Sequence, residues 1–387
     1  MLKVLAIANY RSLRSVVLPL ASLNVITGEN GSGKSSMYRA LRLLADTAQG
    51  SVIASLAREG GLQSTLWAGP EKIPRAMRRG EVPVQGGPRT EPVNLRLGFS
   101  GDELNYCIDL GLPIAGNSAF GLDPEIKREC IWSGPNFRPA SLLVDRRGPV
   151  VRVRGDDAQW RTVISSMPTF DSMLAQLADP KNAPEVLAVR EQIRSWRFYD
   201  HFRTDVDSPV RQAQLGTRTP ALSHDGRDLA AALQTIIEIG NPERLAEAIA
   251  DAFVGSTLEI ENSSGRFAVF LRQPGLLRPL SAAELSDGTL RYLLLIAALM
   301  TPQPPPLMVL NEPETSLHPD LLPALARLIT AAAERSQVWV VSHSSRLLAA
   351  LQESSACNTI RLAKELGTTQ IDGQGLLDQP AWQWPAR

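Results

Sequence analysis

The sequence lacks the features of a membrane-spanning or disulfide-rich protein. Its best apolar run, Leu290 to Met300, is interrupted by Arg291 and is shorter than the roughly 18 residues that a spanning helix needs. The three cysteines lie far apart without a Cys-x-x-Cys pair, and only four histidines could join them, so neither a disulfide framework nor a zinc site is indicated. The first ten residues have no apolar core followed by a cleavage site, so we expect a first strand there and not a signal peptide. We therefore expect a cytoplasmic protein without a membrane span.

The chain also lacks an excess of charge of either sign. Forty basic and forty acidic side chains cancel, so any binding to nucleic acid has to come from a local patch. With 44% hydrophobic and 21% charged residues, the composition is that of an ordinary globular protein. The 387 residues are enough for two or three domains, or for one large domain with an insertion. Lysine is scarce, at six residues, and one of the six, Lys34, lies in the most informative motif.

A glycine-rich loop stands between a predicted strand and a predicted helix. Leu23 to Thr27 is a short apolar, β-branched run, and the next eight residues match G-x-x-x-x-G-K-S/T at every fixed position. Ser36 to Ala45 then has the apolar spacing of a helix. Backbone N–H groups of such a loop converge on a phosphate, the lysine neutralises the outer phosphates and the serine hydroxyl can bind Mg²⁺. The predicted phosphate-binding residues are Gly28, Asn30, Gly31, Ser32, Gly33, Lys34, Ser35 and Ser36.

Polar residues far downstream stand at the ends of apolar segments. Leu285 to Thr289 precedes the apolar helix Leu290 to Leu299, although Ser-Asp-Gly is also a good helix cap. The apolar run Leu307 to Leu310 ends in Asn311-Glu312-Pro313-Glu314, and Val338 to Val341 ends in Ser342-His343-Ser344. A parallel sheet binds its ligands at the carboxyl ends of its strands, so these polar residues are candidates for a site.

The order of these motifs resembles the ABC-type ATPase heads, in particular the branch of RecF, structural-maintenance-of-chromosomes (SMC) and overcoming-lysogenization-defect proteins. Gly28 to Ser35 matches the Walker A loop, Leu285 to Thr289 the signature motif and Leu307 to Glu312 the Walker B strand. Ser316 to Asp320 corresponds to the D-loop and His343 to the switch histidine. The opening Ala8 to Ser12 is similar to the start of that branch, which adds Tyr10 and Arg11 as candidate site residues, and Gln63 is the candidate for the Q-loop glutamine.

The resemblance implies an α/β P-loop head with a mixed sheet flanked by helices, and an ATPase that uses ATP and Mg²⁺. Glu312 would accept the proton of the attacking water, and His343 would contact the γ-phosphate. Ser35 and Asn311 would hold Mg²⁺. Ser286 and Gly288 would bind the γ-phosphate of ATP held by the opposite protomer, so a head-to-tail homodimer enclosing two ATP molecules is implied.

Two positions depart from the family pattern. The residue before the catalytic glutamate is usually aspartate, but here it is Asn311, which brings no charge to the metal. Signature position Asp287 is usually glycine, and its carboxylate would lie near the incoming phosphate. Both changes predict weaker magnesium retention or slow turnover, with ATP binding retained.

The long segment between Lys34 and Gly288 predicts an inserted lobe. We expect residues 1–110 and 276–387 to form the two halves of the head, with residues 111–275 as a largely helical insertion. Val93 to Phe99 with Asn105 to Leu110, and Leu258 to Glu261 with Phe267 to Leu271, alternate like hairpins of an antiparallel β subdomain. The sequence has no sustained heptad repeat, so we do not expect coiled-coil arms. Too few residues follow His343 for a nuclease domain, so we expect any nuclease action to belong to a separate effector protein.

Two arginine clusters raise the question of DNA. One contains Arg75, Arg78 and Arg79, and the other contains Arg146, Arg147, Arg152 and Arg154. They could follow a DNA backbone, or they could be ordinary solvated hairpins. The sequence therefore leaves two functions open: an ATPase in DNA maintenance or phage defence, and a nucleotide-gated switch that controls a partner effector with little turnover.

Overall fold

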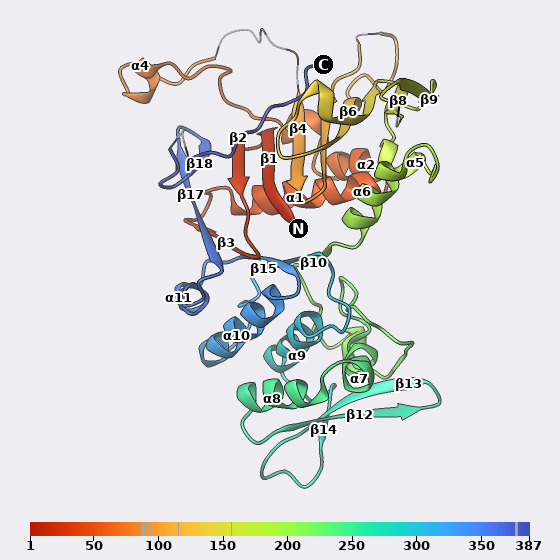
Figure 1. The fold of residues 1–387 in the computed structure, drawn as a ribbon. Helices are drawn as coiled ribbons and strands as arrows, with labels where there is room; N and C mark the ends of the chain where they lie inside the picture. The colour runs from red at the N-terminus through yellow and green to blue at the C-terminus, as the bar shows by residue number, and fades with distance from the viewer. Residues whose placement is uncertain (87–89, 91, 93, 115, 156, 376–377) are drawn as a thin grey trace. The chain divides into compact units, whose positions relative to one another are not determined.

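The computed structural model describes residues 1–387 apart from 87–89, 91, 93, 115, 156, 376 and 377 (Figure 1). The chain forms two compact units and passes between them several times. Unit 1 contains residues 1–20, 28–195 and 360–387, and unit 2 contains residues 21–27 and 196–359. The segment predicted as an inserted lobe, 111–275, is shared between them, because residues 111–195 lie in unit 1 and residues 196–275 lie in unit 2.

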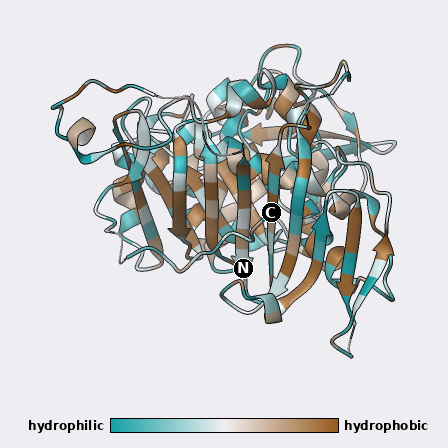
Figure 2. Ribbon diagram, turned by 90° about the horizontal axis from the view of Figure 1, so that it is seen from above, coloured by the Kyte–Doolittle hydropathy of each residue, from teal (hydrophilic) through white to brown (hydrophobic). Residues whose placement is uncertain are grey.

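Unit 1 is built on an eight-stranded antiparallel sheet with the order β2-β1-β4-β5-β6-β7-β8-β9. Its strands are β1 (Leu2–Tyr10), β2 (Leu13–Pro19), β4 (Leu95–Gly101), β5 (Leu104–Gly111), β6 (Glu125–Ser133), β7 (Leu142–Arg147), β8 (Val150–Arg154) and β9 (Trp160–Ile164). The hairpin predicted between residues 93 and 110 is confirmed as β4 and β5, although Val93 lies outside the described residues. Apolar bands run along these strands (Figure 2), so both the sheet and the helices that cover it are held by hydrophobic burial.

Helices cover one face of this sheet (Figure 1), and α1 and α6 pack against its strands. The helices of unit 1 are α1 (Lys34–Ala48), α2 (Val52–Arg58), α3 (Gly61–Thr65), α4 (Arg75–Arg78), α5 (Met173–Gln176) and α6 (Pro184–Arg194), with the 3₁₀ turn η1 (Pro139–Ser141). The C-terminal segment packs on unit 1 through Trp382, whose ring contacts Trp132 and Trp384 at centroid distances of 5.6 and 5.2 Å. This aromatic pair is therefore a packing element.

A fully buried ion pair joins β6 and β7. Arg146 Nη1 lies 2.6 Å from Glu129 Oε2, and both side chains are 0% exposed. Glu129 also accepts hydrogen bonds from Tyr106 and Ser172, so each charge is compensated inside the unit. The suggestion that Arg146 contacts DNA is therefore wrong, because its guanidinium is enclosed. Arg147 is half exposed and pairs with Asp145.

Unit 2 contains a parallel sheet in which β10, β15, β16 and β3 are adjacent in that order. Its strands are β10 (Arg197–Tyr199), β15 (Leu307–Asn311), β16 (Gln337–Val341) and β3 (Leu23–Gly28), and β17 (Cys357–Glu365) follows β3 and leads back to unit 1, where it pairs with β18 (Thr368–Ile371). Their near-continuous apolar sequences are typical of parallel strands buried on both faces. The two apolar strands predicted from 307–310 and 338–341 are confirmed.

Helices and a small antiparallel sheet complete unit 2. The helices are α7 (Leu229–Ile239), α8 (Pro242–Ala252), α9 (Asp287–Leu299), α10 (Leu322–Ala333) and α11 (Ser345–Gln352), with 3₁₀ turns η2 (Pro209–Arg211) and η3 (Pro319–Leu321). The sheet consists of β11 (Gln214–Leu215), β12 (Thr257–Ser263), β13 (Arg266–Arg272) and β14 (Leu280–Ser281), and it contacts α7 and α8. The second predicted hairpin is confirmed as β12 and β13, but the two hairpins belong to different sheets and not to one β subdomain.

Helix length limits what the described part of the chain can form. The longest helix among the described residues is α1, with 15 residues. None of the described helices combines the length and apolarity that a bilayer crossing requires.

Candidate active site

The Walker A loop of unit 1 has a backbone that depends on glycine. Gly28, Gly31 and Gly33 have φ angles of +149°, +78° and +114°, which side chains rarely allow. Close packing adds a second constraint, because a Cβ on Gly28 would lie 2.3 Å from the carbonyl oxygen of Leu362, and one on Gly33 would lie 2.2 Å from Thr369 Oγ1. The loop therefore turns tightly enough to expose its own N–H groups at the start of α1.

The start of α1 is available to an anion. The first N–H groups of a helix have no intrahelical partner, and among the described residues no side chain caps this one. The Lys34 ammonium folds back over the loop and donates to the carbonyl oxygens of Gly28 (2.6 Å) and Glu29 (3.0 Å). Ser35 is exposed in the first turn. A cation, free amides and a hydroxyl thus lie together, which is the donor set that a polyphosphate requires.

Strand β18 supports this loop, and the sequence motifs did not reveal it. Thr369 Oγ1 lies 2.7 Å from the Ser32 carbonyl oxygen and 2.8 Å from Ser12 Oγ, and the Thr369 N–H donates to the Ser12 carbonyl at 2.8 Å. The hydroxyl therefore links the Walker A loop to the turn after β1. No motif spacing connects Thr369 with Ser32, so only the fold could bring them together.

The candidates at the end of β1 are bound to α2 and its following turn. The Tyr10 hydroxyl donates to Glu59 Oε2 at 2.7 Å, and Arg11 Nη2 donates to the same oxygen at 2.7 Å. Burial, reinforced by the nearby Glu59 carboxylate, raises the pKa of Tyr10 well above its usual range. Arg11 has a φ of +49°, so the backbone is strained at this turn. Gln63, the Q-loop candidate, is exposed on α3.

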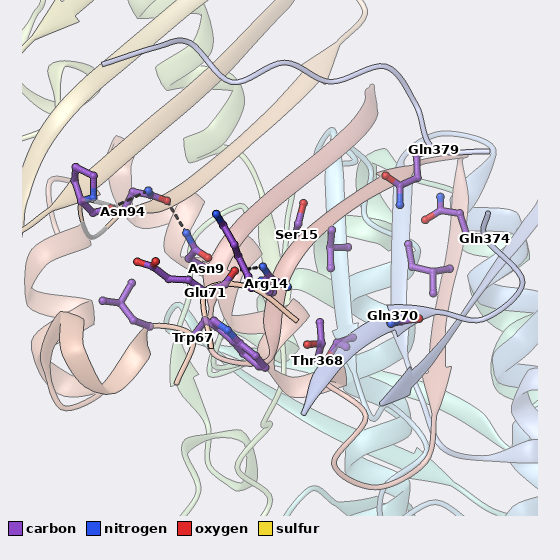
Figure 3. Close-up of a pocket in the computed structure, with 16 residues that line it drawn as sticks. Asn9, Arg14, Ser15, Trp67, Glu71, Asn94, Thr368, Gln370, Gln374 and Gln379 are labelled. Atoms are coloured by element: carbon purple, nitrogen blue, oxygen red, sulfur yellow. Dashed lines mark hydrogen bonds between the residues drawn. The ribbon is translucent and has the colours of Figure 1, made fainter. Parts of the chain in front are cut away.

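A polar cavity of about 560 Å³ lies in unit 1 beside β18 and the first two strands (Figure 3). Asn9 donates from Nδ2 to Asn94 Oδ1 at 2.6 Å, and Trp67 Nε1 donates to the Pro70 carbonyl at 3.1 Å. Thr369 belongs both to the wall of this cavity and to the contact with Ser32. Thr369 therefore contacts both the cavity and the Walker A loop.

In unit 2, the carboxyl ends of three parallel strands meet at one edge of the sheet. Asn311 at the end of β15 is level with Val341 of β16, and Val341 is level with Ile26 of β3, two residues before Gly28. Glu312 follows with a φ of +49° and donates its N–H to the Val341 carbonyl at 2.8 Å. Its side chain is 46% exposed. A strained, solvent-accessible carboxylate at a strand end is a common arrangement for a reactive group.

His343 lies between two carboxylates with different surroundings. Its Nδ1 is 3.6 Å from Glu312 Oε1 and 3.6 Å from Glu314 Oε1. Glu314 is only 7% exposed, and its Oε1 accepts hydrogen bonds from Ser342 Oγ (2.6 Å) and from the N–H groups of His343 and Ser344 (both 3.2 Å). Glu314 therefore holds the turn that presents His343, a function that sequence analysis did not assign.

Arg291 is the buried cation of this region. Arg291 lies on α9 and is only 6% exposed, and its Nε has no hydrogen-bond partner among the described residues. Burial lowers its pKa, while the charges of Glu314 and Glu312 act in the opposite direction. The Oε2 atom of Glu314 is likewise buried without a partner in the described part of the chain. The buried glutamate thus has a compensating charge near it, but no direct hydrogen bond joins the two.

The signature segment begins α9 and touches the D-loop. Ser286 is the N-cap of the helix, and its Oγ accepts from the Thr289 N–H at 3.2 Å. A Cβ on Gly288 would lie 2.8 Å from the carbonyl oxygen of Ser316, so glycine is needed for this close approach. The capping alternative thus describes the local geometry of Ser286, and the exposed helix N-terminus remains suited to an anion.

A Walker A loop follows one parallel strand, and acidic and histidine residues follow the next two, which is the arrangement expected of a P-loop ATPase. A family comparison matches residues 23–349 to the family described as "AAA domain, putative AbiEii toxin, Type IV TA system", and the chain belongs to this family. Membership implies that ATP is the ligand of the Walker A loop. No curated protein matches the chain.

Three solved structures of SMC heads align with nearly the whole chain. An SmcHead bound to the C-winged helix domain of ScpA aligns with a TM-score of 0.50 and 13% identity, covering 97% of this chain and 98% of that one. The SMC head domain from Thermotoga maritima aligns with a TM-score of 0.43 and 16% identity over 97% and 99% of the two chains. An Smc head with an extended coiled coil, bound to the C-terminal domain of ScpA from Pyrococcus furiosus, aligns with a TM-score of 0.47, 13% identity and 96% and 95% coverage. The first of these supports the expected α/β head fold.

Proposed function

We propose that this protein hydrolyses ATP slowly and forms a head-to-tail dimer that encloses two ATP molecules. The observation that carries the proposal is the edge of the parallel sheet, where β3 leads into Gly28, β15 into Asn311 and Glu312, and β16 into His343. Ligands of open α/β sheets bind at such an edge.

Each side chain has a role that follows from its chemistry. The N–H groups of the Walker A loop and Lys34 bind the β- and γ-phosphates. Glu312 accepts the proton that water loses as its oxygen bonds to the γ-phosphorus and the bond to the β–γ bridging oxygen breaks. Its exposure and its lack of a structural hydrogen bond in the described contacts suit this task. His343, which is 56% exposed, contacts the γ-phosphate.

The proposed site would hold a magnesium ion with fewer protein charges than usual. The Ser35 hydroxyl and the Asn311 side-chain oxygen would hold it, since Mg²⁺ prefers oxygen ligands and keeps several waters. When bound, the ion neutralises charge on the transferring phosphoryl group. Asn311 is half buried at the end of β15 and brings no charge of its own. We therefore expect slow turnover with ATP binding retained.

The signature residues Ser286 and Gly288 complete the site of the opposite protomer. The N-terminus of α9 is exposed at Ser286, and the positive end of the helix dipole favours an anion there. ATP then acts as the contact between two heads.

The biological setting that we propose is phage defence or DNA maintenance, and the family name, which refers to a putative toxin of a type IV TA system, supports a role in defence. A switch that controls a partner effector is the second candidate, and Asn311 favours it because slow hydrolysis would prolong the ATP-bound state. ATPase rates with and without DNA separate the two: stimulation by DNA favours the first, and a low rate that only a partner protein changes favours the second. For DNA contact, Arg75 and Arg79 remain exposed.

The test is the mass of a Glu312→Gln protein measured by light scattering. Removing the proton acceptor should trap the joined state, so we expect a monomer without nucleotide and a stable dimer with ATP and Mg²⁺. Adding Ser286→Arg should block the dimer while labelled ATP still binds, because the long side chain fills the γ-phosphate pocket. Adding Lys34→Ala should remove both. A Glu312→Gln protein of the same mass with and without ATP would overturn the proposal.

A further inference from the structure

The signature loop of unit 2 is wrapped around one guanidinium group from a distant part of the chain. Arg211 lies in η2, between α6 and α7, and its side chain is only 10% exposed. Its Nη1 lies 3.2, 3.2 and 2.8 Å from the carbonyl oxygens of Ala282, Ala283 and Leu285. These residues lead directly into the N-cap Ser286. The backbone just before the signature serine is therefore shaped by a cation that the signature motif does not contain.

The same guanidinium is anchored on its other side and carries an ion pair. Its Nε donates to the carbonyl oxygens of Thr204 (2.8 Å) and Asp205 (3.1 Å), which hold the group in place. Its Nη2 lies 2.5 Å from Asp287 Oδ1, and Asp287 is 61% exposed. A rigid, planar fork of donors can satisfy several carbonyls and a carboxylate at once, whereas a lysine could not.

Asp287 poses an electrostatic problem that this contact resolves. A carboxylate in the first turn of a helix is favourable for the helix itself, but it weakens the attraction of that N-terminus for a second anion. The head-to-tail dimer of the proposed function brings a γ-phosphate to this N-terminus. Because Arg211 is paired with Asp287, the signature loop approaches the phosphate without an uncompensated negative charge.

We propose that Arg211 is the positioning residue of the signature loop. In this proposal the Arg211–Asp287 ion pair also compensates the negative charge of Asp287, which would otherwise weaken the attraction of the helix N-terminus for the γ-phosphate. This inference rests on the proposed function. The inference also assigns a role to the segment between α6 and α7, because η2 supplies the cation that orders a loop about 70 residues later in the sequence.

The experiment uses the full-length Glu312→Gln protein, whose dimer with ATP and Mg²⁺ is measured by analytical ultracentrifugation. Three variants are added to this parent: Arg211→Gln, Asp287→Asn and the combination of both. Arg278→Gln is the matched control, because Arg278 forms an exposed ion pair with Glu284 in the same loop and reaches none of the three carbonyls. Labelled ATP binding at protein concentrations below dimerisation reports on the Walker A loop separately.

We expect Arg211→Gln to raise the dimer dissociation constant about tenfold or more, since about 1.4 kcal/mol corresponds to each factor of ten, while monomer ATP binding is unchanged. Adding Asp287→Asn to Arg211→Gln should recover a large part of this loss, because the uncompensated carboxylate is removed; a merely structural Arg211 would show no such recovery. Asp287→Asn alone should tighten the dimer, because the Arg211 charge becomes free to face the phosphate. Arg278→Gln should behave like the parent.

The outcomes distinguish this inference from the function on which it rests. A parent that stays monomeric with ATP overturns the proposed dimer and this inference with it. A parent that dimerises, together with an Arg211→Gln variant that dimerises equally well, overturns the inference alone. If Arg211→Gln does not fold, Asp287→Asn decides, because it leaves the carbonyl contacts intact, and an unchanged dissociation constant for that variant refutes the role of the pair.

Discussion

Two glutamates only two residues apart should differ in how the same substitution changes the stability of the protein. Glu314 is 7% exposed and accepts three hydrogen bonds through Oε1, whereas Glu312 is 46% exposed and faces His343. We expect Glu314→Gln to destabilise the protein and Glu312→Gln to leave its stability unchanged. Glu314 is part of the fold, whereas Glu312 takes part in the chemistry only under the proposed function.

The magnitude follows from the contacts of Glu314. A hydrogen bond to an ionised acceptor is about twice as strong as a neutral one, and a neutral one contributes about 1 kcal/mol, so converting three bonds costs about 3 kcal/mol. The new amide also places N–H groups where Oε2 is buried, and the buried Arg291 loses a nearby opposite charge. The total loss is about 3–5 kcal/mol, which for a unit of this size lowers the melting temperature by about 6–20 °C.

Urea and thermal denaturation of the two variants and the wild type test this prediction. Glu312→Gln should lie within about 0.5 kcal/mol of the wild type, because exposed substitutions have small effects. Glu314→Gln should unfold at clearly lower urea concentration with an unchanged slope. Equal stability of Glu314→Gln and the wild type, or an equal loss in both variants, would refute the reasoning from burial and hydrogen bonding.

Two further predictions concern the nucleotide and the metal. Lys34→Ala should abolish ATP binding, because the loop N–H groups cannot offset the phosphate charge alone, and equilibrium binding of labelled ATP at unchanged affinity would contradict this. Asn311→Asp should raise the ATPase rate or lower the magnesium concentration that is required, because it adds the missing charge beside the metal; titration of the rate with Mg²⁺ measures both, and no change in either would show that Asn311 does not hold the ion.

Much of the fold could be predicted because its signals are local. The parallel strands are short apolar runs, the hairpins alternate in period two, and the Walker A glycines occupy positions where the backbone has positive φ. The division of residues 111–275 between two units was not visible, because it depends on which neighbours β6 and β10 acquire. Strand pairing between distant segments has no signature within either strand.

The candidate site shows the same limit residue by residue. Asn311, Glu312 and His343 could be proposed as site residues because a strand end followed by polar residues is a local pattern, and the structure shows that they follow β15 and β16. The sequence assigns no role to Glu314, which lies two residues after Glu312. A carboxylate that organises a turn has the same sequence signature as a solvated one. For Arg146 the sequence predicts an exposed cation, because its partner, Glu129, belongs to a neighbouring strand and no local pattern connects the two.

By itself, the sequence indicated the class of protein, through the resemblance that its ordered motifs carry, and it supplied the hypothesis for the chemistry at the strand ends. Only the tertiary structure decided which charges are buried, which carboxylate is structural, and which distant residues support the loops. Thr369 beside Ser32 and Arg211 beside Asp287 are contacts between segments far apart in the chain. Such contacts arise from packing of whole elements, where burial and complementary hydrogen bonds select the partner, and no local pattern specifies them.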